Sequence, residues 1–229
     1  MIKRIYILHG WAYSTHKWEQ FLSELKSHGF EPIMLKIPGL TAEIEKPWDI
    51  NDYVTWLEKS LSKDKKVILL GHSNGGRIIL AYCLKYPEKV TQAILLDSAG
   101  IYHNEFHLQL KRFVFGNIAK LKKILPSDDL KKVLYKTARE EDYYRASPIM
   151  KKTMANLIES DLSDKLENIS IPTLIIWGEN DTTTPLSDGR LIHKKIKISK
   201  LFIIKNARHS PMFTHAKEVG KIITEELVG

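Results

Sequence analysis

Cysteine and long apolar stretches are both scarce in this sequence. Among its 229 residues Cys83 is the single cysteine, so no disulfide can form within the chain. No apolar run approaches the roughly 20 residues that cross a bilayer. The first apolar run, residues 5–8, is too short for the core of a signal peptide. We therefore expect a cytoplasmic protein without a membrane span, with Cys83 as a buried structural thiol.

The sequence also lacks a block of charge of one sign. Lys and Arg number 35 against 27 Asp and Glu, a formal net charge of +8, but the basic residues are scattered over many segments. No zinc-finger, helix-turn-helix or RNA-binding motif accompanies them. An affinity for acidic partners is one interpretation of the excess. A basic surface that faces solvent is the other, and we expect no nucleic-acid partner.

Short apolar strands alternate with amphipathic helices along most of the chain. The strands are apolar on both faces, which is typical of a parallel sheet covered by helices on both sides. The pattern predicts an α/β fold with about six mainly parallel strands flanked by helices. The expected strands are 3–8, 31–37, 67–70, 90–96, 173–177 and 200–204, and the clearest expected helices are 15–28, 77–86, 186–195 and 211–227.

Residues 101–165 interrupt this alternation. They are rich in lysine, have no strand pattern and read as about three helical segments. We interpret them as a helical cap inserted into a core formed by 1–100 and 166–229, in a single domain overall. Four aromatic residues of the segment are candidates to line an apolar substrate pocket, although packing within the cap explains each of them as well: Tyr102, Phe106, Phe113 and Phe115.

A candidate nucleophile lies in the middle of the chain. Residues 71–75 read Gly-His-Ser-Asn-Gly and match the pattern G-x-S-x-G, directly after an expected strand and before an expected helix. This context is that of the nucleophile elbow, a tight turn that exposes a serine hydroxyl above the sheet. An ordinary glycine-rich turn is the alternative. We predict that Ser73 is the nucleophile.

A serine nucleophile needs a base, and the base needs an acid that fixes its tautomer. In an open parallel sheet such groups follow the strands. His209 lies between the last strand and the last helix and is the strongest base candidate. Asp181 follows the preceding strand and gives the chain order of elbow enzymes, so we predict it as the acid. Asp97 is the alternative acid, and Glu179 is expected to brace the turn.

Acyl transfer also needs donors for the developing oxyanion. One donor is expected to be the backbone N–H of Asn74, the residue after the nucleophile. The other is expected from the loop after the first strand, which indicates the N–H of Trp11. A core aromatic is the simpler interpretation of Trp11, and the two roles are compatible.

The sequence gives little support for a metal site. His103 and His107 have the spacing of two ligands on a helix, but the segment is not H-E-x-x-H and no third ligand is evident. We expect no metal and no cofactor.

Together these motifs resemble the α/β-hydrolase fold family, specifically its small cap-bearing serine esterases and carbon–carbon bond hydrolases. The similarity covers nearly all of the chain outside the cap. It implies that the first two strands of the family's common form are missing here. Haloalkane dehalogenases and epoxide hydrolases have Asp where Ser73 stands, and the bulky Trp11 departs from the glycine-rich loop of tertiary-alcohol esterases.

The resemblance implies a carboxylesterase that cleaves small esters through a Ser73–His209–Asp181 triad. A thioesterase or a carbon–carbon bond hydrolase on the same triad is an alternative, and so is a ligand-binding protein without activity, because fold does not fix function. The substrate and the oligomeric state are left open by the sequence.

Overall fold

The computed structural model describes residues 3–61, 66–103 and 146–228. Within these residues six strands form one sheet in the order β2-β1-β3-β4-β5-β6, and all five neighbouring pairs are parallel. The predicted parallel α/β sheet is therefore confirmed. The strands are β1 (Lys3–Leu8), β2 (Phe30–Met34), β3 (Val67–His72), β4 (Val90–Leu96), β5 (Thr173–Gly178) and β6 (Ser199–Ile204).

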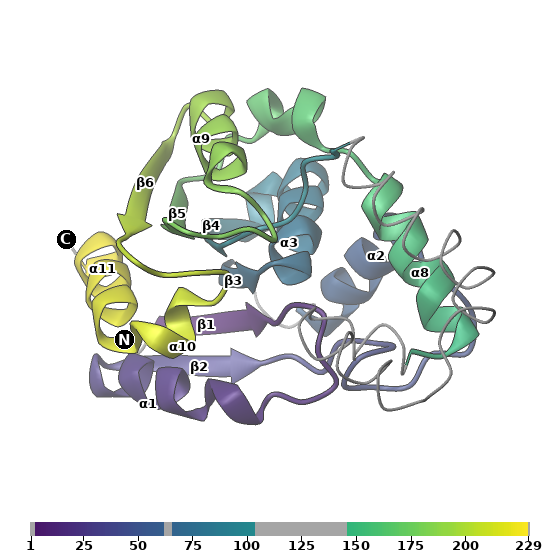
Figure 1. The fold of residues 1–229 in the computed structure, drawn as a ribbon, viewed down its shortest axis with the longest axis horizontal. Coiled ribbons are helices and arrows are strands. Elements are labelled where there is room, and N and C mark those ends of the chain that lie inside the picture. Colours follow the sequence, from purple (N-terminus) through teal and green to yellow (C-terminus); the bar gives the residue numbers. More distant parts are fainter. Residues whose placement is uncertain (1–2, 62–65, 104–145, 229) are drawn as a thin grey trace, which may run out of the picture.

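Helices cover both faces of the sheet (Figure 1). No helix of the described residues combines the length and apolarity needed to cross a bilayer. The helices are η1 (His16–Trp18), α1 (Glu19–Ser27), α2 (Ile50–Ser60), α3 (Asn74–Lys85), η2 (Pro87–Lys89), α8 (Pro148–Glu159), η4 (Ser163–Asn168), α9 (Leu186–Lys195), α10 (Pro211–Thr214) and α11 (Ala216–Val228).

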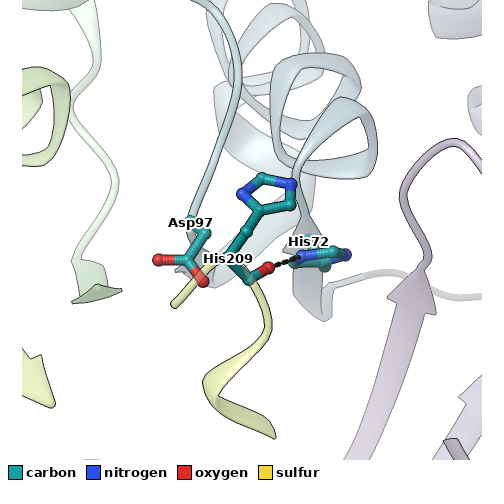
Figure 2. A group of neighbouring side chains, drawn as sticks. All are labelled: His72, Asp97 and His209. Carbon is teal, nitrogen blue, oxygen red and sulfur yellow. Dashed lines mark hydrogen bonds between the residues drawn. The ribbon is translucent and has the colours of Figure 1, made fainter. Parts of the chain in front are cut away.

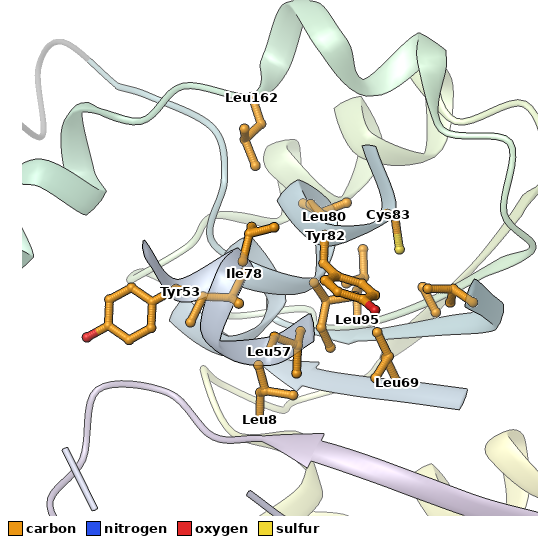
Figure 3. Packing of buried hydrophobic residues seen from close by; sticks show 14 of the residues in the cluster. Leu8, Tyr53, Leu57, Leu69, Ile78, Leu80, Tyr82, Cys83, Leu95 and Leu162 are labelled. Atoms are coloured by element: carbon orange, nitrogen blue, oxygen red, sulfur yellow. The ribbon is translucent and has the colours of Figure 1, made fainter. Parts of the chain in front are cut away.

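Alternate side chains of each strand divide the core into two layers, because neighbouring residues of a strand point to opposite faces. Ile5 and Ile7 of β1 pack with α1, α10 and α11, whereas Leu8 packs with α2 and α3. In the second layer, leucines of neighbouring strands lie against Ile78 and Tyr82 of α3 (Figure 3). Cys83 is buried in this layer as predicted, and burial raises the pKa of its thiol to about 12.

Two expected elements differ from the structure. The strand expected to reach Ile37 ends at Met34, because the carbonyl of Ile37 accepts backbone hydrogen bonds from Leu40, Thr41 and Ala42 and so closes a turn. The helix expected over 211–227 is broken at His215, whose φ of −131° and ψ of 41° are not helical. The hydroxyl of Thr214 also lies 3.5 Å from the carbonyl of Ser210, a contact from side chain to backbone of the kind that weakens helix hydrogen bonding.

The predicted cap falls largely on residues 104–145, which lie outside the described residues. Of the remainder, α8 is tied to the segment after β2, since Trp48 N donates to Thr153 Oγ1 (3.0 Å) and Asn156 Nδ2 donates to the carbonyl of Trp48 (3.1 Å). The two ends of the predicted insertion also meet, because Leu162 N donates to the carbonyl of Gly100 (3.0 Å). The division into core and insertion stays a prediction.

β1 and α3 approach so closely that glycine is required between them. A Cβ atom on Gly75 would lie 2.1 Å from the carbonyl oxygen of Leu8, far inside van der Waals contact with an atom of the sheet backbone. Gly29, shortly after α1, has room for a side chain but an unfavourable backbone conformation. Its φ is +83°, but a Cβ atom there would meet nothing within 4 Å.

We expect Gly75→Ala to lower the free energy of unfolding by about 3 kcal/mol, because backbone must move to admit the methyl group. Gly29→Ala serves as the control and is expected to cost about 1 kcal/mol, from backbone conformation alone. Urea unfolding of both variants checks the difference. If both variants lose the same free energy of unfolding, the close approach of β1 and α3 adds no cost beyond that of backbone conformation, and the expectation is wrong.

Candidate active site

Ser73 lies at the junction of β3 and α3 in a strained conformation. Its φ is 53° and its ψ is −118°, a region that non-glycine residues rarely occupy. The backbone on both sides holds it there. Ser73 N donates to the carbonyl of Leu96 (3.1 Å), and the Ser73 carbonyl accepts from Gly76 N (3.0 Å) and Ala99 N (2.9 Å). The expected strand–turn–helix context is present, and α3 begins immediately after Ser73.

The structure brings Ser73, His209 and Asp181 together. His209 is in the loop between β6 and α10, and its Nε2 lies 3.0 Å from Ser73 Oγ. Its Nδ1 lies 2.7 Å from Asp181 Oδ2. Both His209 and Asp181 are buried. In this arrangement the serine hydroxyl donates to Nε2, and the Nδ1–H group donates to the carboxylate.

The Asp181 carboxylate is surrounded by donors. Its Oδ1 accepts from Thr183 N (2.7 Å) and Thr184 N (3.2 Å), and Thr184 Oγ1 lies 2.8 Å from Oδ2. Burial of Asp181 favours the neutral acid. The hydrogen bond and charge of His209 and the threonine donors favour the carboxylate more strongly, so the pKa of Asp181 lies below its ordinary value of 3.8.

Sequence reasoning missed Thr184. Besides its contact with Asp181, its hydroxyl lies 3.2 Å from Nδ1 of His209 and 3.1 Å from the carbonyl of Asp97. The available signal was the run of three threonines directly after Asp181, since an aspartate often accepts hydrogen bonds from backbone N–H groups two or three residues later.

Asp97 and Glu179, the other acids considered, have different contacts. Asp97 ends β4 with a φ of 42°, and its Oδ1 accepts a hydrogen bond from Gly178 N at 2.8 Å. It therefore joins the ends of β4 and β5. Glu179 Oε2 accepts from Asn206 N at 3.0 Å and braces the turns that follow β5 and β6. The carboxylate at hydrogen-bond distance from Nδ1 of His209 is that of Asp181.

The loop expected to provide an oxyanion donor passes beside the nucleophile. A Cβ atom on Gly10 would lie 3.0 Å from Cβ of Ser73, so residues 9–11 contact the elbow directly. Among the described residues, the backbone N–H groups of Trp11 and Asn74 have no acceptor. Trp11 is half-buried and packs against the core, so its aromatic role holds as well. The assignment of these two donors stays a prediction.

The predicted substrate pocket falls mostly on residues outside the described part of the chain. Phe106, Phe113 and Phe115 lie outside the described residues, and Tyr102 is half-buried with its backbone N donating to Asp161 Oδ1 (3.2 Å). The described residues do form a cavity of about 420 Å³ over the loops that follow β1 and β2. Its lining includes Tyr13, Ile44 and Met150, but not Ser73, Asp181 or His209.

Two histidine groups bear on metal binding. His103 Nε2 lies 2.8 and 2.9 Å from the two carboxylate oxygens of buried Asp188, while His107 lies outside the described residues. His72, Asp97 and His209 offer ligand atoms that all lie within 4.8 Å of one another (Figure 2). Both ring nitrogens of His209 are already hydrogen-bonded, and His72 Nε2 donates to the carbonyl of His209. A cation would have to break these bonds.

Comparisons with known proteins identify the fold family of this chain. A sequence model of the alpha/beta hydrolase fold matches residues 3–216. A pimeloyl-[acyl-carrier protein] methyl ester esterase of Neisseria meningitidis serogroup B is 20% identical over 251 residues, covering 100% of this chain and 94% of that protein. A proline iminopeptidase of Saccharolobus solfataricus is 25% identical over 263 residues, covering 97% of this chain and 84% of that protein.

Solved structures show the same fold. The enol-lactonase of Burkholderia xenovorans LB400 superposes with a TM-score of 0.77 at 16% identity, covering 100% of this chain and 92% of that chain. The bromoperoxidase of Bacillus anthracis superposes with a TM-score of 0.77 at 24% identity, covering 100% of this chain and 93% of that chain.

The lowered pKa of Asp181 has a consequence for stability. Because the folded protein favours the carboxylate, this group stabilises the fold above its unfolded pKa, and the contribution is lost as pH falls below about 4. We expect the difference in unfolding free energy between wild type and Asp181→Asn to shrink as pH falls through that range. Urea unfolding of both proteins across acid pH measures it, and a difference that stays constant would contradict the expectation.

Proposed function

We propose that this chain, which belongs to the α/β hydrolase fold family, is a serine hydrolase that cleaves small carboxylic esters through an acyl-enzyme. The observation that carries the proposal is the continuous set of hydrogen bonds from Ser73 Oγ through the His209 ring to Asp181. A binding protein has no need for a strained serine, a buried imidazole and a carboxylate held in one line.

The first half-reaction forms the acyl-enzyme. Ser73 Oγ attacks the ester carbonyl carbon while its proton passes to Nε2 of His209. Asp181 stabilises the resulting imidazolium and keeps Nδ1 protonated. The negative charge that develops on the carbonyl oxygen is held by the backbone N–H groups of Trp11 and Asn74, each worth roughly 3 kcal/mol in the transition state. The carbon–oxygen bond then breaks, and the leaving alkoxide takes the proton from Nε2.

The second half-reaction reverses these roles. A water molecule gives a proton to Nε2 of His209 and attacks the acyl carbon, and the collapse of the second tetrahedral intermediate returns the proton to Ser73. The products are a carboxylic acid and the free enzyme. No step requires a metal or a cofactor.

The names of the relatives guide the choice of substrates for a screen. The relatives compared above are named for a methyl ester and for an N-terminal proline, so a substrate screen should include both. It should contain 4-nitrophenyl esters of increasing chain length, methyl esters free and linked to an acyl carrier protein, and an N-terminal prolyl amide. Thioesters and carbon–carbon substrates test the remaining alternatives. We expect the short free esters to be turned over.

An active-site serine probe tests the nucleophile. A fluorophosphonate should label the wild-type protein at Ser73, and Ser73→Ala should remove both the labelling and the turnover of 4-nitrophenyl acetate, the latter by at least roughly 10³-fold. Labelling that survives in Ser73→Ala would refute the proposal. Tight ligand binding without turnover of any substrate in the screen would favour a binding protein instead.

A matched pair of variants tests the acid. Asp181→Asn should lower kcat for 4-nitrophenyl acetate by about 10³- to 10⁴-fold, because an amide does not hold the imidazole in the required tautomer. Asp97→Asn retains an acceptor for Gly178 N and should stay within about tenfold of wild type. If Asp97→Asn lowers kcat more than Asp181→Asn does, the acid is Asp97 and not Asp181.

A further inference from the structure

His72 is the residue before Ser73 and the last residue of β3, and the proposed mechanism does not use it. Its side chain is 7% exposed. Its Nε2 donates a hydrogen bond of 2.8 Å to the backbone carbonyl oxygen of His209 (Figure 2). The elbow thus contacts His209 twice, through the Ser73 hydroxyl at the ring and through the His72 ring at the backbone.

The His72 ring is fixed by its neighbours. Trp18 and Phe213 pack against it with ring centroids at 6.1 and 6.5 Å, and the His209 ring lies 4.9 Å away. On another side, a Cβ atom on Gly10 would lie 3.0 Å from Nδ1 of His72, so the backbone of residues 9–11 closes over the ring. A ring held in this way can direct its N–H group at one point with little freedom.

The backbone of His209 has little other support. Among the described residues, the one hydrogen bond made to its own peptide groups is the bond from His72. The residues around His209 are held by backbone hydrogen bonds instead. Asn180 N donates to the Ala207 carbonyl (2.8 Å), and Ser210 N donates to the Arg208 carbonyl (2.7 Å).

We propose that His72 is a positioning residue, which holds the backbone of His209 so that Nε2 stays within bonding distance of Ser73 Oγ. The inference rests on the proposed function and adds a residue to it. His209 must face Ser73, the leaving group and water in turn while it gains and loses a proton. A shift of about 1 Å in such a group can cost about 100-fold in rate.

Two substitutions separate hydrogen bonding from packing. His72→Gln keeps an N–H donor at similar reach, and His72→Leu fills similar space without a donor. With 4-nitrophenyl acetate, we expect His72→Leu to lower kcat by about 10- to 100-fold with KM nearly unchanged. His72→Gln should recover kcat to within about fivefold of wild type. If His72→Leu does not fold, His72→Met replaces it as the variant without a donor.

Phe30→Leu is the packing control, because Phe30 is buried in the same core layer but lies at the start of β2, at the opposite end of the sheet from His72. It should lower the melting temperature and leave kcat near wild type. A second readout does not depend on activity. The downfield proton NMR resonance of the His209 Nδ1–H group, hydrogen-bonded to Asp181, should be sharp in wild type and His72→Gln, and broadened in His72→Leu.

Equal loss of kcat in His72→Leu and His72→Gln would overturn the inference in favour of packing. Wild-type kcat and a sharp resonance in His72→Leu would overturn it outright. If the wild-type protein is neither labelled at Ser73 nor active on any ester, the proposed function fails instead, and the NMR comparison still tests whether His72 holds His209.

Discussion

The close approach of β1, β3 and α3 is the constraint on which the site depends. A Cβ atom on Gly71 would lie 2.6 Å from Gly76 N, one on Gly75 2.1 Å from the Leu8 carbonyl, and one on Gly76 2.1 Å from Ser98 Oγ. Only glycine leaves room for the backbone at the first two positions and for the Ser98 side chain at the third. With that room available, the chain turns sharply at Ser73. Its N–H donates to the Leu96 carbonyl, its carbonyl accepts from Gly76 N and Ala99 N, and these bonds hold the strained residue in place.

Parallel pairing explains why distant residues meet. Every strand of the described sheet runs in the same direction, so the segments that follow β3, β5 and β6 emerge at one edge and bring Ser73, Asp181 and His209 together. Asp97, directly after β4, accepts a hydrogen bond from Gly178 N at the end of β5 and so links these two strands at the same edge. The arrangement is polar and buried, and each carboxylate oxygen of Asp181 has a donor, which a buried charge requires.

Most of the fold was predictable, because apolar strands and amphipathic helices alternate plainly in the sequence. Chain order and strand ends were also sufficient to place Ser73, Asp181 and His209 near one another, although their catalytic roles stay predictions. Sequence reasoning failed where a contact in space decides the outcome. The contacts of His72 with His209, and of Thr184 with His209 and Asp97, join residues far apart in the chain, and no local pattern reveals them. The predicted pocket depends on residues outside the described part of the chain.

The hydrogen bond between Gly100 and Leu162 has a consequence for how such a protein diversifies. This bond joins the two ends of the segment 101–161 shortly after β4, so we expect that the segment can be resized without shifting any strand. Lengthening a segment whose ends already meet costs little entropy, about 0.6 kcal/mol for each doubling. Gly100 and Leu162 are therefore a natural junction, at which the intervening segment can be replaced without rebuilding the sheet.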